Sequence, residues 1–320
     1  MSWRPSSSAD VARQRAMLLD RTRSYFRDQS VLEVDTPALS SSAVSDPNIK
    51  SLSVAGVDDG VARLFLHTSP EFCMKRMLAD GYPDIYSICR VFRGGELGRS
   101  HQPEFTMVEW YRLEFGLAEI IEDTLRLLAV ALGDRTPTRP PAQLTYRQAF
   151  IDTVGVDPLT TNTEALAHAT TKDEALRDAI GDDRNAWLDL LFSTTVADSF
   201  PGDRLTVVTH FPAGQAALAR LDDDDASVAE RFEVFSGALE LANGYVELTD
   251  EIELRARFRS DLDKRAATGS TVPPLDERFL QAMRSGLPAC AGVALGFERL
   301  HMLYAGTRNI RDVISFEFET

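Results

Sequence analysis

The first third of the chain shows apolar positions in two different periods. Apolar residues at helical spacing open the chain and predict a helix that Ser8 or Asp10 can cap. The stripe that this helix would bury consists of Val11, Leu18, Thr22 and Tyr25. Residues 31–37 then alternate like a strand that Pro37 ends, and a serine-rich loop follows from Ser40 to Ser45.

The run Thr68-Ser69-Pro70-Glu71 predicts a second helix start. Ser69 suits the N-cap position, Pro70 suits the first turn, and Glu71 would lie near the positive end of the helix. Short apolar or alternating runs on either side of it predict strands. These strands are expected at residues 64–66, 84–93 and 103–111, and a glycine-rich, charged loop joins the last two.

The middle third of the chain is mainly helical in its pattern. An amphipathic helix is expected over residues 117–133, and an acidic, alanine-rich helical stretch continues to about residue 200. Strand patterns resume at residues 205–209, so we interpret residues 134–204 as a helical insertion in a single domain spanning 1–320. Long helices that alternate irregularly with hairpin-like strands favour an α+β fold, in which helices flank an antiparallel sheet.

Composition and charge narrow the class of protein. Apolar residues make up 44% of the 320 residues and charged residues 26%, which is typical of a folded domain and argues against disorder. No apolar run approaches the ~18 residues of a membrane span and no leader pattern opens the chain, so we expect a cytoplasmic protein without membrane contact. The net charge of -15 disfavours extensive nucleic-acid binding. Cys73, Cys89 and Cys290 form no CxxC pair and are expected to be reduced thiols.

The loop between the strands at 84–93 and 103–111 is the first candidate site. Residues 90–105 combine three arginines and a histidine with three glycines. Glycines let a backbone approach a ligand closely, and guanidinium groups match phosphate and carboxylate oxygens. A basic hairpin loop without a ligand is the alternative, since the known nucleotide loops GxGxxG and GxxxxGK[ST] are absent.

Three glutamates spaced by seven residues form the second candidate site. A two-residue turn at Ser236-Gly237 would place Glu233 and Glu240 opposite each other on two strands, where like charges repel unless a cation lies between them. Magnesium takes such carboxylates together with phosphate oxygens. Asn243-Gly244 supplies a second turn or bulge that would bring Glu247 near Glu240. Three solvent-facing glutamates on an edge strand are the alternative.

Two weaker signals complete the set. Residues 292–300 predict a buried strand, a glycine break and a helix with Arg299 in its first turn, where an arginine can lie flat on an aromatic ring. Glu71 at its helix start lies one turn before Lys75, and an ion pair or a cap explains that pair without any function.

In this order, the segments resemble the catalytic domain of class II aminoacyl-tRNA synthetases of the lysyl type. The first motif of that family corresponds to the helix and strand ending at Pro37, which builds the family's dimer interface, so the resemblance implies a homodimer. The second motif corresponds to residues 92–105 and the third to residues 292–299. The lysyl subtype is carried by residues 68–76, 101–107 and 240–245.

Length separates two branches of this family. Lysyl-tRNA synthetases carry an N-terminal OB-fold module that reads the anticodon, and we expect none here because the first motif starts near residue 10. The chain therefore resembles the truncated paralogues, the ligases that attach (R)-β-lysine to a lysine of translation elongation factor P. Residues 99–101, residues 108–112 and Ala242, where the synthetase has glycine, also look like these paralogues. The resemblance implies ATP and Mg²⁺, elongation factor P as protein acceptor, and β-lysine or lysine as substrate.

Residue roles follow from the resemblance, position by position. Arg93 and Arg299 are the implied catalytic residues: Arg93 holds the α-phosphate and the substrate carboxylate, and Arg299 sandwiches the adenine against Phe105. Glu71 takes the amino group nearer the carboxyl end, and Glu247 takes the distal ammonium with Tyr111 and Glu109. The implied ATP-binding residues are Arg93, Gly94, Gly95, Glu96, Gln102, Phe105, Glu240, Leu241, Gly296 and Arg299. The implied substrate-binding residues are Ser69, Pro70, Glu71, Glu109, Tyr111, Ala242 and Glu247, and the implied metal ligands are Glu233 and Glu240.

One position departs from the family pattern. The family has glutamate two residues after the motif 2 arginine, and this chain has Gly95 there, followed by Glu96. Either Glu96 shifts to fill the role or the backbone makes the adenine contact. Two alternatives to the ligase remain open at this point: an enzyme that charges tRNA with lysine, and a non-catalytic paralogue with a regulatory role.

Overall fold

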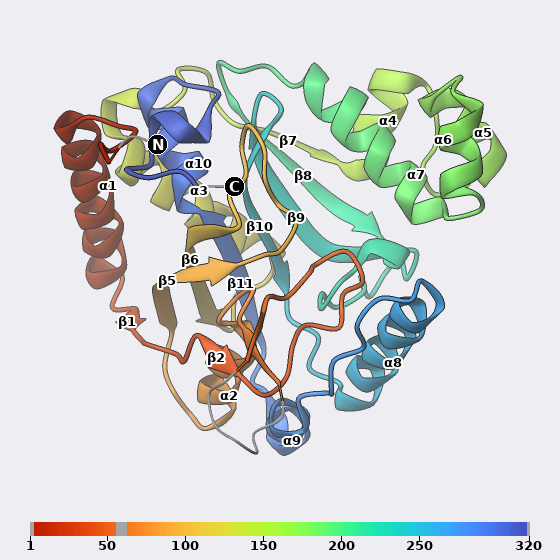
Figure 1. Ribbon diagram of the computed structural model, residues 1–320, viewed down its shortest axis with the longest axis horizontal. Helices are drawn as coiled ribbons and strands as arrows, with labels where there is room; N and C mark the ends of the chain where they lie inside the picture. Colours follow the sequence, from red (N-terminus) through yellow and green to blue (C-terminus); the bar gives the residue numbers. More distant parts are fainter. Residues whose placement is uncertain (1–2, 56–62, 319–320) are drawn as a thin grey trace. The chain divides into compact units, whose positions relative to one another are not determined.

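The computed structural model describes residues 3–55 and 63–318, which belong to two compact units. One unit comprises Met1–Thr136 with Glu247–Thr320, and the other comprises Pro137–Val246. In both units most strand pairs are antiparallel and helices pack beside the strands (Figure 1). The predicted α+β class, with an antiparallel sheet flanked by helices, is confirmed.

The first unit is built on a strand ladder that joins distant parts of the chain. β5 pairs antiparallel with β6, β6 pairs antiparallel with β11, and β1 pairs parallel with β5. A second, three-stranded sheet has the order β2-β4-β3. The strands are β1 (Leu32–Glu33), β2 (Leu39–Ser40), β3 (Ser53–Val54), β4 (Leu64–Leu66), β5 (Ile85–Phe92), β6 (Glu104–Leu113) and β11 (Cys290–Gly296).

Helices of the first unit fall into two groups. α1, α3 and α10 contact one another, and α3 and α10 also contact the central strands, whereas α9 contacts both α2 and α8 (Figure 1). The helices are α1 (Ala9–Asp28), α2 (Glu71–Ala79), α3 (Leu117–Leu132), α8 (Glu251–Ala267), α9 (Glu277–Gly286) and α10 (Phe297–Ala305). No helix within residues 3–55 and 63–318 is both long and apolar enough to cross a membrane.

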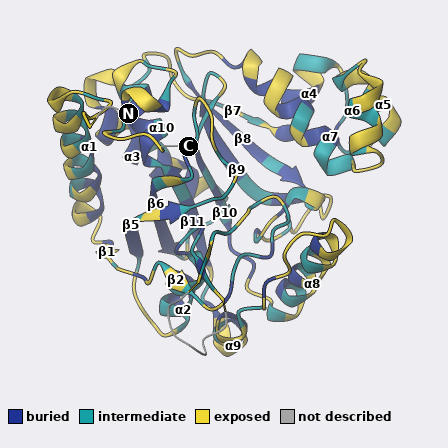
Figure 2. Ribbon diagram, in the orientation of Figure 1, coloured by how far each residue is buried: buried dark blue, intermediate teal, exposed yellow. Residues whose placement is uncertain are grey.

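The core of the first unit lies on the helix-covered side of the central strands. Phe26 of α1 stacks on Tyr86 of β5, with ring centroids 4.2 Å apart. The buried carboxylate of Asp123 on α3 accepts hydrogen bonds from Tyr25 Oη (2.6 Å) and Trp110 Nε1 (3.0 Å). One satisfied polar group thereby connects α1, α3 and β6. Figure 2 shows these strands dark and the outer faces of the helices exposed.

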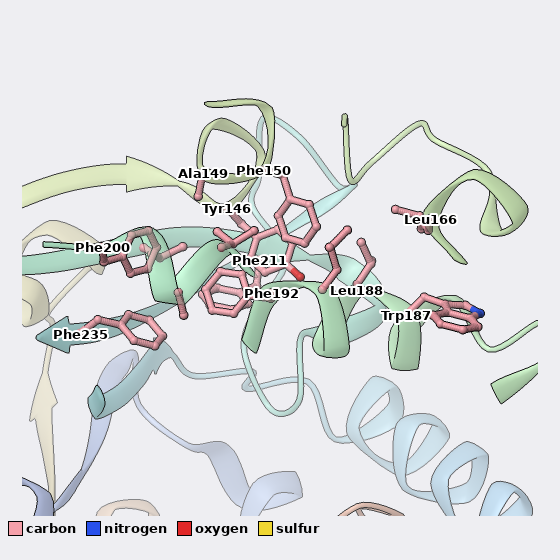
Figure 3. Close-up of a cluster of buried hydrophobic side chains, with 14 residues drawn as sticks. Tyr146, Ala149, Phe150, Leu166, Trp187, Leu188, Phe192, Phe200, Phe211 and Phe235 are labelled. Atoms are coloured by element: carbon pink, nitrogen blue, oxygen red, sulfur yellow. The ribbon is translucent and has the colours of Figure 1, made fainter. Parts of the chain in front are cut away.

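The second unit has the strand order β10-β9-β8-β7, in which only β7 and β8 run parallel. Its core is an aromatic cluster in which Phe192 stacks on Tyr146, with centroids 5.0 Å apart, and Phe235 of β9 packs against Phe200 (Figure 3). The elements are β7 (Ala142–Thr145), α4 (Tyr146–Val154), α5 (Thr163–Thr170), α6 (Glu174–Ile180), α7 (Arg184–Leu191), β8 (Leu205–Pro212), β9 (Val228–Ser236) and β10 (Leu239–Val246).

The predictions of helices and strands were most accurate where one apolar periodicity continued over many residues. The helices at 9–28 and 117–132 and the strands at 85–92 and 104–113 lie where the pattern placed them. The strand expected over residues 31–37 is only Leu32–Glu33, because the Asp35 carboxylate accepts the Thr36 amide and withdraws that donor from the ladder. β7 was not predicted, and the three cysteines are free thiols, as expected.

Candidate active site

The start of α2 positions the first site residues. Ser69 Oγ accepts a hydrogen bond from the Glu71 backbone N–H (3.0 Å), but the N-cap residue is Pro70 and not Ser69 as predicted, since the helix begins at Glu71. The same hydroxyl donates to Glu109 Oε2 at 2.7 Å. Pro70 precedes the first helical residue, Glu71. The Ser69 hydroxyl therefore connects the start of α2 to Glu109 of β6.

Strand alternation in β6 sorts its side chains between core and site. Trp110 points to the helix-covered core, so its neighbours Glu109 and Tyr111 point to the other side of the strand. Tyr111 Oη donates to Glu109 Oε1 at 2.7 Å, so the two Glu109 oxygens accept from Tyr111 and Ser69. Glu109 thus orients both hydroxyl groups.

A buried ion-pair cluster lies beside these residues. The ammonium of Lys75 is 2.6 Å from Glu71 Oε1 and also forms an ion pair with Glu247 Oε2. It lies 6.0 Å from the centre of the Tyr111 ring. Only 1% of the Lys75 and Glu247 side chains is exposed. The structure therefore brings together Ser69, Glu71, Glu109, Tyr111 and Glu247, which the resemblance had assigned to one substrate pocket.

Gly292 on β11 makes room for this cluster. It pairs with Tyr111 across the β6–β11 ladder. A Cβ atom at Gly292 would lie 2.5 Å from Glu247 Oε1 and 2.5 Å from Tyr111 Cε1, closer than real Cβ contacts allow. Glu247 Oε1 is buried and has no hydrogen-bond partner within the described residues. The glycine thus leaves a carboxylate oxygen that can accept from a cationic ligand.

Burial and like charges raise the pKa of two glutamates in the pocket. Burial, with the charge of Glu71, raises the pKa of Glu109 to about 7. Burial raises the pKa of Glu247 to about 8, although the Lys75 ammonium lowers it. Burial alone would lower the pKa of Lys75, but the charges of Glu247 and Glu71 outweigh it and raise that pKa above its ordinary value. A pocket of this kind favours ligands that bring positive charge.

The serine-rich loop borders this pocket. A cavity of about 200 Å³ is lined by residues 39–44 of the loop together with Ser69, Pro70 and Glu71. The buried Arg265 guanidinium of α8 holds the loop by donating to the backbone carbonyls of Ser45 (2.7 Å) and Ile49 (2.7 Å). Sequence reasoning did not identify Arg265, and only its position on a polar helix could have drawn attention to it.

The glycine-rich loop arranges the nucleotide candidates around Arg93. The Arg93 guanidinium lies over the Phe105 ring, with Cζ 5.2 Å from the ring centre, and Nε donates to the Thr68 carbonyl at 3.4 Å. Glu96 Oε1 lies 3.8 Å from Arg93 Nη1. Gly95 has φ +83, a left-handed conformation that glycine adopts freely, and a Cβ there would touch nothing within 4 Å. The left-handed backbone conformation at position 95, and not a lack of room for a side chain, therefore accounts for Gly95.

Gly94 and Gln102 anchor the same loop. The Gly94 amide donates to the Lys50 carbonyl at 2.7 Å. Gln102 Oε1 accepts from the Phe318 amide at 3.0 Å, whereas the buried Gln102 Nε2 has no partner within the described part of the chain. That orphan donor suits a ligand atom.

The third-motif segment folds as predicted. β11 ends at Gly296, and Arg299 lies in the first turn of α10, where its Nη2 is 2.7 Å from His101 Nε2. A Cβ at Gly296 would meet only the Arg299 side chain, at an ordinary 3.5 Å. Packing does not require glycine at position 296, which is consistent with a ligand occupying that space.

The hairpin of the second unit differs from the prediction. The turn is Gly237-Ala238 and not Ser236-Gly237, because Ser236 pairs with Leu239. The register also shifts between Glu240 and Ala242, so Glu240 lies opposite Phe235, and Glu233 lies opposite Asn243. The expectation that Glu233 and Glu240 face each other directly is therefore wrong. The bulge still leaves both on one face of the hairpin, because opposed residues and alternate residues of a strand share a face.

Glu233 is buried and carries an internal counter-charge. Arg231 Nη2 lies 2.6 Å from Glu233 Oε1, and Arg231 Nε donates to Asn243 Oδ1 at 3.2 Å. Burial, together with the charge of Glu240, raises the pKa of Glu233 to about 7 despite Arg231. No group of three metal-ligating side chains occurs among the residues described. A carboxylate pair fits a magnesium ion that takes its other ligands from phosphates and water. Leu241 and Ala242, at the bulge, are 1% exposed.

Comparison with known proteins agrees with this geometry. The family model described as tRNA synthetases class II (D, K and N) matches residues 1–320. Similar relatives named elongation factor P--(R)-beta-lysine ligase come from Vibrio atlanticus (43% identity) and Pectobacterium atrosepticum (42%), each aligned over 99% of this chain and 98% of the relative. The ligase of the same name from Avibacterium paragallinarum is 40% identical over 99% of this chain and 98% of its own length. The chain belongs to the class II tRNA synthetase family of the D, K and N type.

Proposed function

We propose that this protein is an ATP-dependent ligase that activates (R)-β-lysine and transfers it to a lysine of elongation factor P. The observation that carries the proposal is the buried pocket in which Glu71, Glu109 and Glu247 gather in the first unit, with Arg93 bonded to the adjoining Thr68 carbonyl. Carboxylates suit the two ammonium groups of a diamino acid, and an arginine beside them suits its carboxylate and a phosphate. The names and nearly full-length alignment of the relatives support the same reading.

The first step forms an acyl-adenylate. A carboxylate oxygen of β-lysine attacks the α-phosphorus of ATP, and the bond from that phosphorus to the β-phosphate bridging oxygen breaks, so pyrophosphate leaves. Arg93 neutralises the α-phosphate and the attacking carboxylate, while Arg299 and Phe105 hold the adenine. Glu71 receives the nearer ammonium, and Glu247 receives the distal one. The protein's contribution is positioning and charge neutralisation, because little covalent chemistry is required of it.

The second step forms an amide. The neutral ε-amine of the acceptor lysine attacks the carbonyl carbon of the adenylate, AMP leaves with the electrons of the broken C–O bond, and the amine proton passes to water. A neutral amine is a strong nucleophile, so the step requires no dedicated base in the protein.

Glu233 and Glu240 are the residues that we assign to magnesium. Two carboxylates on one face of a hairpin, one of them with its pKa raised by burial and by the charge of the other, form a donor set that a divalent cation would stabilise. Magnesium would supply charge neutralisation to the ATP phosphates.

Three further expectations from the sequence remain part of the proposal. We infer a homodimer formed through α1 and the segment to Pro37, a cytoplasmic location, and one catalytic core in which residues 134–204 are an insertion. Sedimentation of the purified protein at several concentrations tests the dimer directly.

The proposal predicts a specific order of substrates. Purified protein should exchange pyrophosphate into ATP best with (R)-β-lysine and more weakly with α-lysine, and should then add the amino acid to elongation factor P, detected by the mass increase of the acceptor. An acceptor whose target lysine is replaced by arginine is the matched control. Transfer to tRNA but not to the factor would replace the ligase with a synthetase. Exchange with no diamino acid would favour a non-catalytic paralogue.

A further inference from the structure

Lys75 is the one lysine of this chain that is withdrawn from solvent. Its side chain is 1% exposed, whereas Lys50, Lys172 and Lys264 are exposed. Burying an ammonium costs free energy that only close counter-charges offset, and apolar residues would fill the same space more favourably. The burial of Lys75 is therefore not explained by the stability of α2 alone.

The contacts of Lys75 point to that reason. Glu71, one helical turn away on α2, explains a local ion pair. Helix spacing does not explain the second ion pair, with Glu247. Glu247 belongs to the segment after β10, and its backbone amide donates to the Cys290 carbonyl at 3.0 Å. The Lys75 ammonium thus joins one oxygen of Glu71 to one oxygen of Glu247. These are the two carboxylates assigned above to the two amino groups of the substrate.

We propose that Lys75 is a positioning residue for the amino-acid pocket: it holds Glu71 and Glu247 at a fixed separation, and so determines which diamino acids bind. The inference rests on the proposed function in one respect, that these carboxylates receive the substrate ammonium groups. Lys75 itself need not touch the reacting atoms.

Charge around Glu247 supports this role. The groups facing Glu247 are Lys75 and Glu71 of α2, Glu109 and Tyr111 of β6, and the Cys290 thiol of β11. Of these, only Lys75 lowers the pKa of Glu247, which burial and the other carboxylates raise to about 8. Without Lys75 the pKa of Glu247 would rise further, so this carboxylate would ionise, and pair with an ammonium group, only at a higher pH.

The direct test replaces Lys75 by methionine, which is similar in shape and uncharged. Binding is measured by calorimetry with α-lysine, (R)-β-lysine and ornithine, which is one methylene shorter than α-lysine, from pH 6 to 9.5. For K75M we expect Kd for both lysines to rise at least about tenfold at pH 7.5 and the midpoint of the pH dependence to move up by about one unit. Discrimination between α-lysine and ornithine should also shrink. K264M, which removes an exposed lysine, is the matched control and should bind like the original protein.

A double variant covers the case in which K75M does not fold. K75M leaves buried carboxylates without their counter-charge, whereas K75M/E247Q removes the pair together and should recover the melting temperature. Because Lys75 acts through Glu247, the losses of affinity in K75M and E247Q should not add in the double variant. Additive losses, or unchanged affinity, pH midpoint and selectivity in K75M, would overturn the proposal.

Separate readouts distinguish this proposal from the proposed function. If the original protein binds diamino acids but modifies no elongation factor P, the ligase is wrong, and the Lys75 proposal still stands or falls with the binding data. If the original protein binds none of the three diamino acids, the pocket assignment is wrong and both proposals fail.

Discussion

Single atoms decide how the amino-acid pocket is shaped. At Gly292 a Cβ would collide with Glu247 and Tyr111 at 2.5 Å, whereas at Gly296 it would touch only Arg299 at 3.5 Å. Both glycines belong to β11, yet only the first is required by neighbouring protein atoms. Packing explains Gly292, and the space beside Gly296 remains available to the nucleotide.

Alanine variants at these two glycines should therefore affect the binding of the diamino acid and of ATP separately. G292A must displace Glu247 or Tyr111, so we expect KM for the diamino acid to rise by up to about a hundredfold and stability to fall by about 1–3 kcal/mol. G296A should keep its melting temperature and its KM for the diamino acid, and raise KM for ATP. Pyrophosphate exchange with each substrate varied in turn measures both constants. An unchanged KM for the diamino acid in G292A would contradict the pocket described here.

Residues that are close in sequence were predicted more reliably than residues that meet only in the fold. The Glu71–Lys75 ion pair follows from helix spacing and is present, and the helix begins one residue later than predicted. The second partner of Lys75, Glu247, lies far along the chain, and no spacing rule links the two. The resemblance gave the members of the pocket but not their hydrogen bonds, such as the Tyr111–Glu109 contact.

At the scale of elements, the hairpin of β9 and β10 shows what patterns leave open. A turn one residue later and an extra residue at the bulge change every opposed pair, although both strands were expected. The alternation of a strand does not reveal a bulge, so the register could not be read from the sequence. The two errors nevertheless leave Glu233 and Glu240 on one face, where the charge of Glu240 adds to burial in raising the pKa of Glu233.

The hairpin supports a prediction for Glu240. The E240Q variant should lose pyrophosphate exchange, because one of two magnesium ligands is gone, and partial recovery is expected at high magnesium concentration. Its melting temperature should stay equal or rise slightly, because the like charge that raises the Glu233 pKa is removed. A matched loss in E233Q would support the pair. Exchange at the original rate in E240Q would remove the metal assignment, and a lower melting temperature would show a structural role instead.

At the scale of the whole molecule, the structure shows where some of the chain's acidic residues lie. The net charge of -15 predicted little beyond poor nucleic-acid binding, yet several carboxylates are buried in candidate sites. The fold class followed from the order of helices and strands, and the division into two compact units did not, because it depends on contacts between distant segments. Buried acids of this kind link stability to pH and to cationic ligands.

Three buried glutamates set the expected pH dependence of stability. Folding raises the pKa of Glu109 and Glu233 to about 7 and that of Glu247 to about 8, from an ordinary value of 4.5. The folded state then binds more protons than the unfolded state between these limits, so stability falls as pH rises from about 4.5 to about 8. The raised pKa of Lys75 stabilises the folded protein by a constant amount below its ordinary value of 10.5, and this contribution is lost only above that value, so it does not affect this window. Calorimetric melting between pH 5 and 9 should therefore give a melting temperature that falls with rising pH, and in E247Q this fall should be shallower near pH 8.

Saturating (R)-β-lysine adds positive charge beside the ionised carboxylates, so its stabilising effect should grow over the same pH range. A melting temperature that is flat or rises toward pH 9 would show that these carboxylates are not protonated in the folded protein.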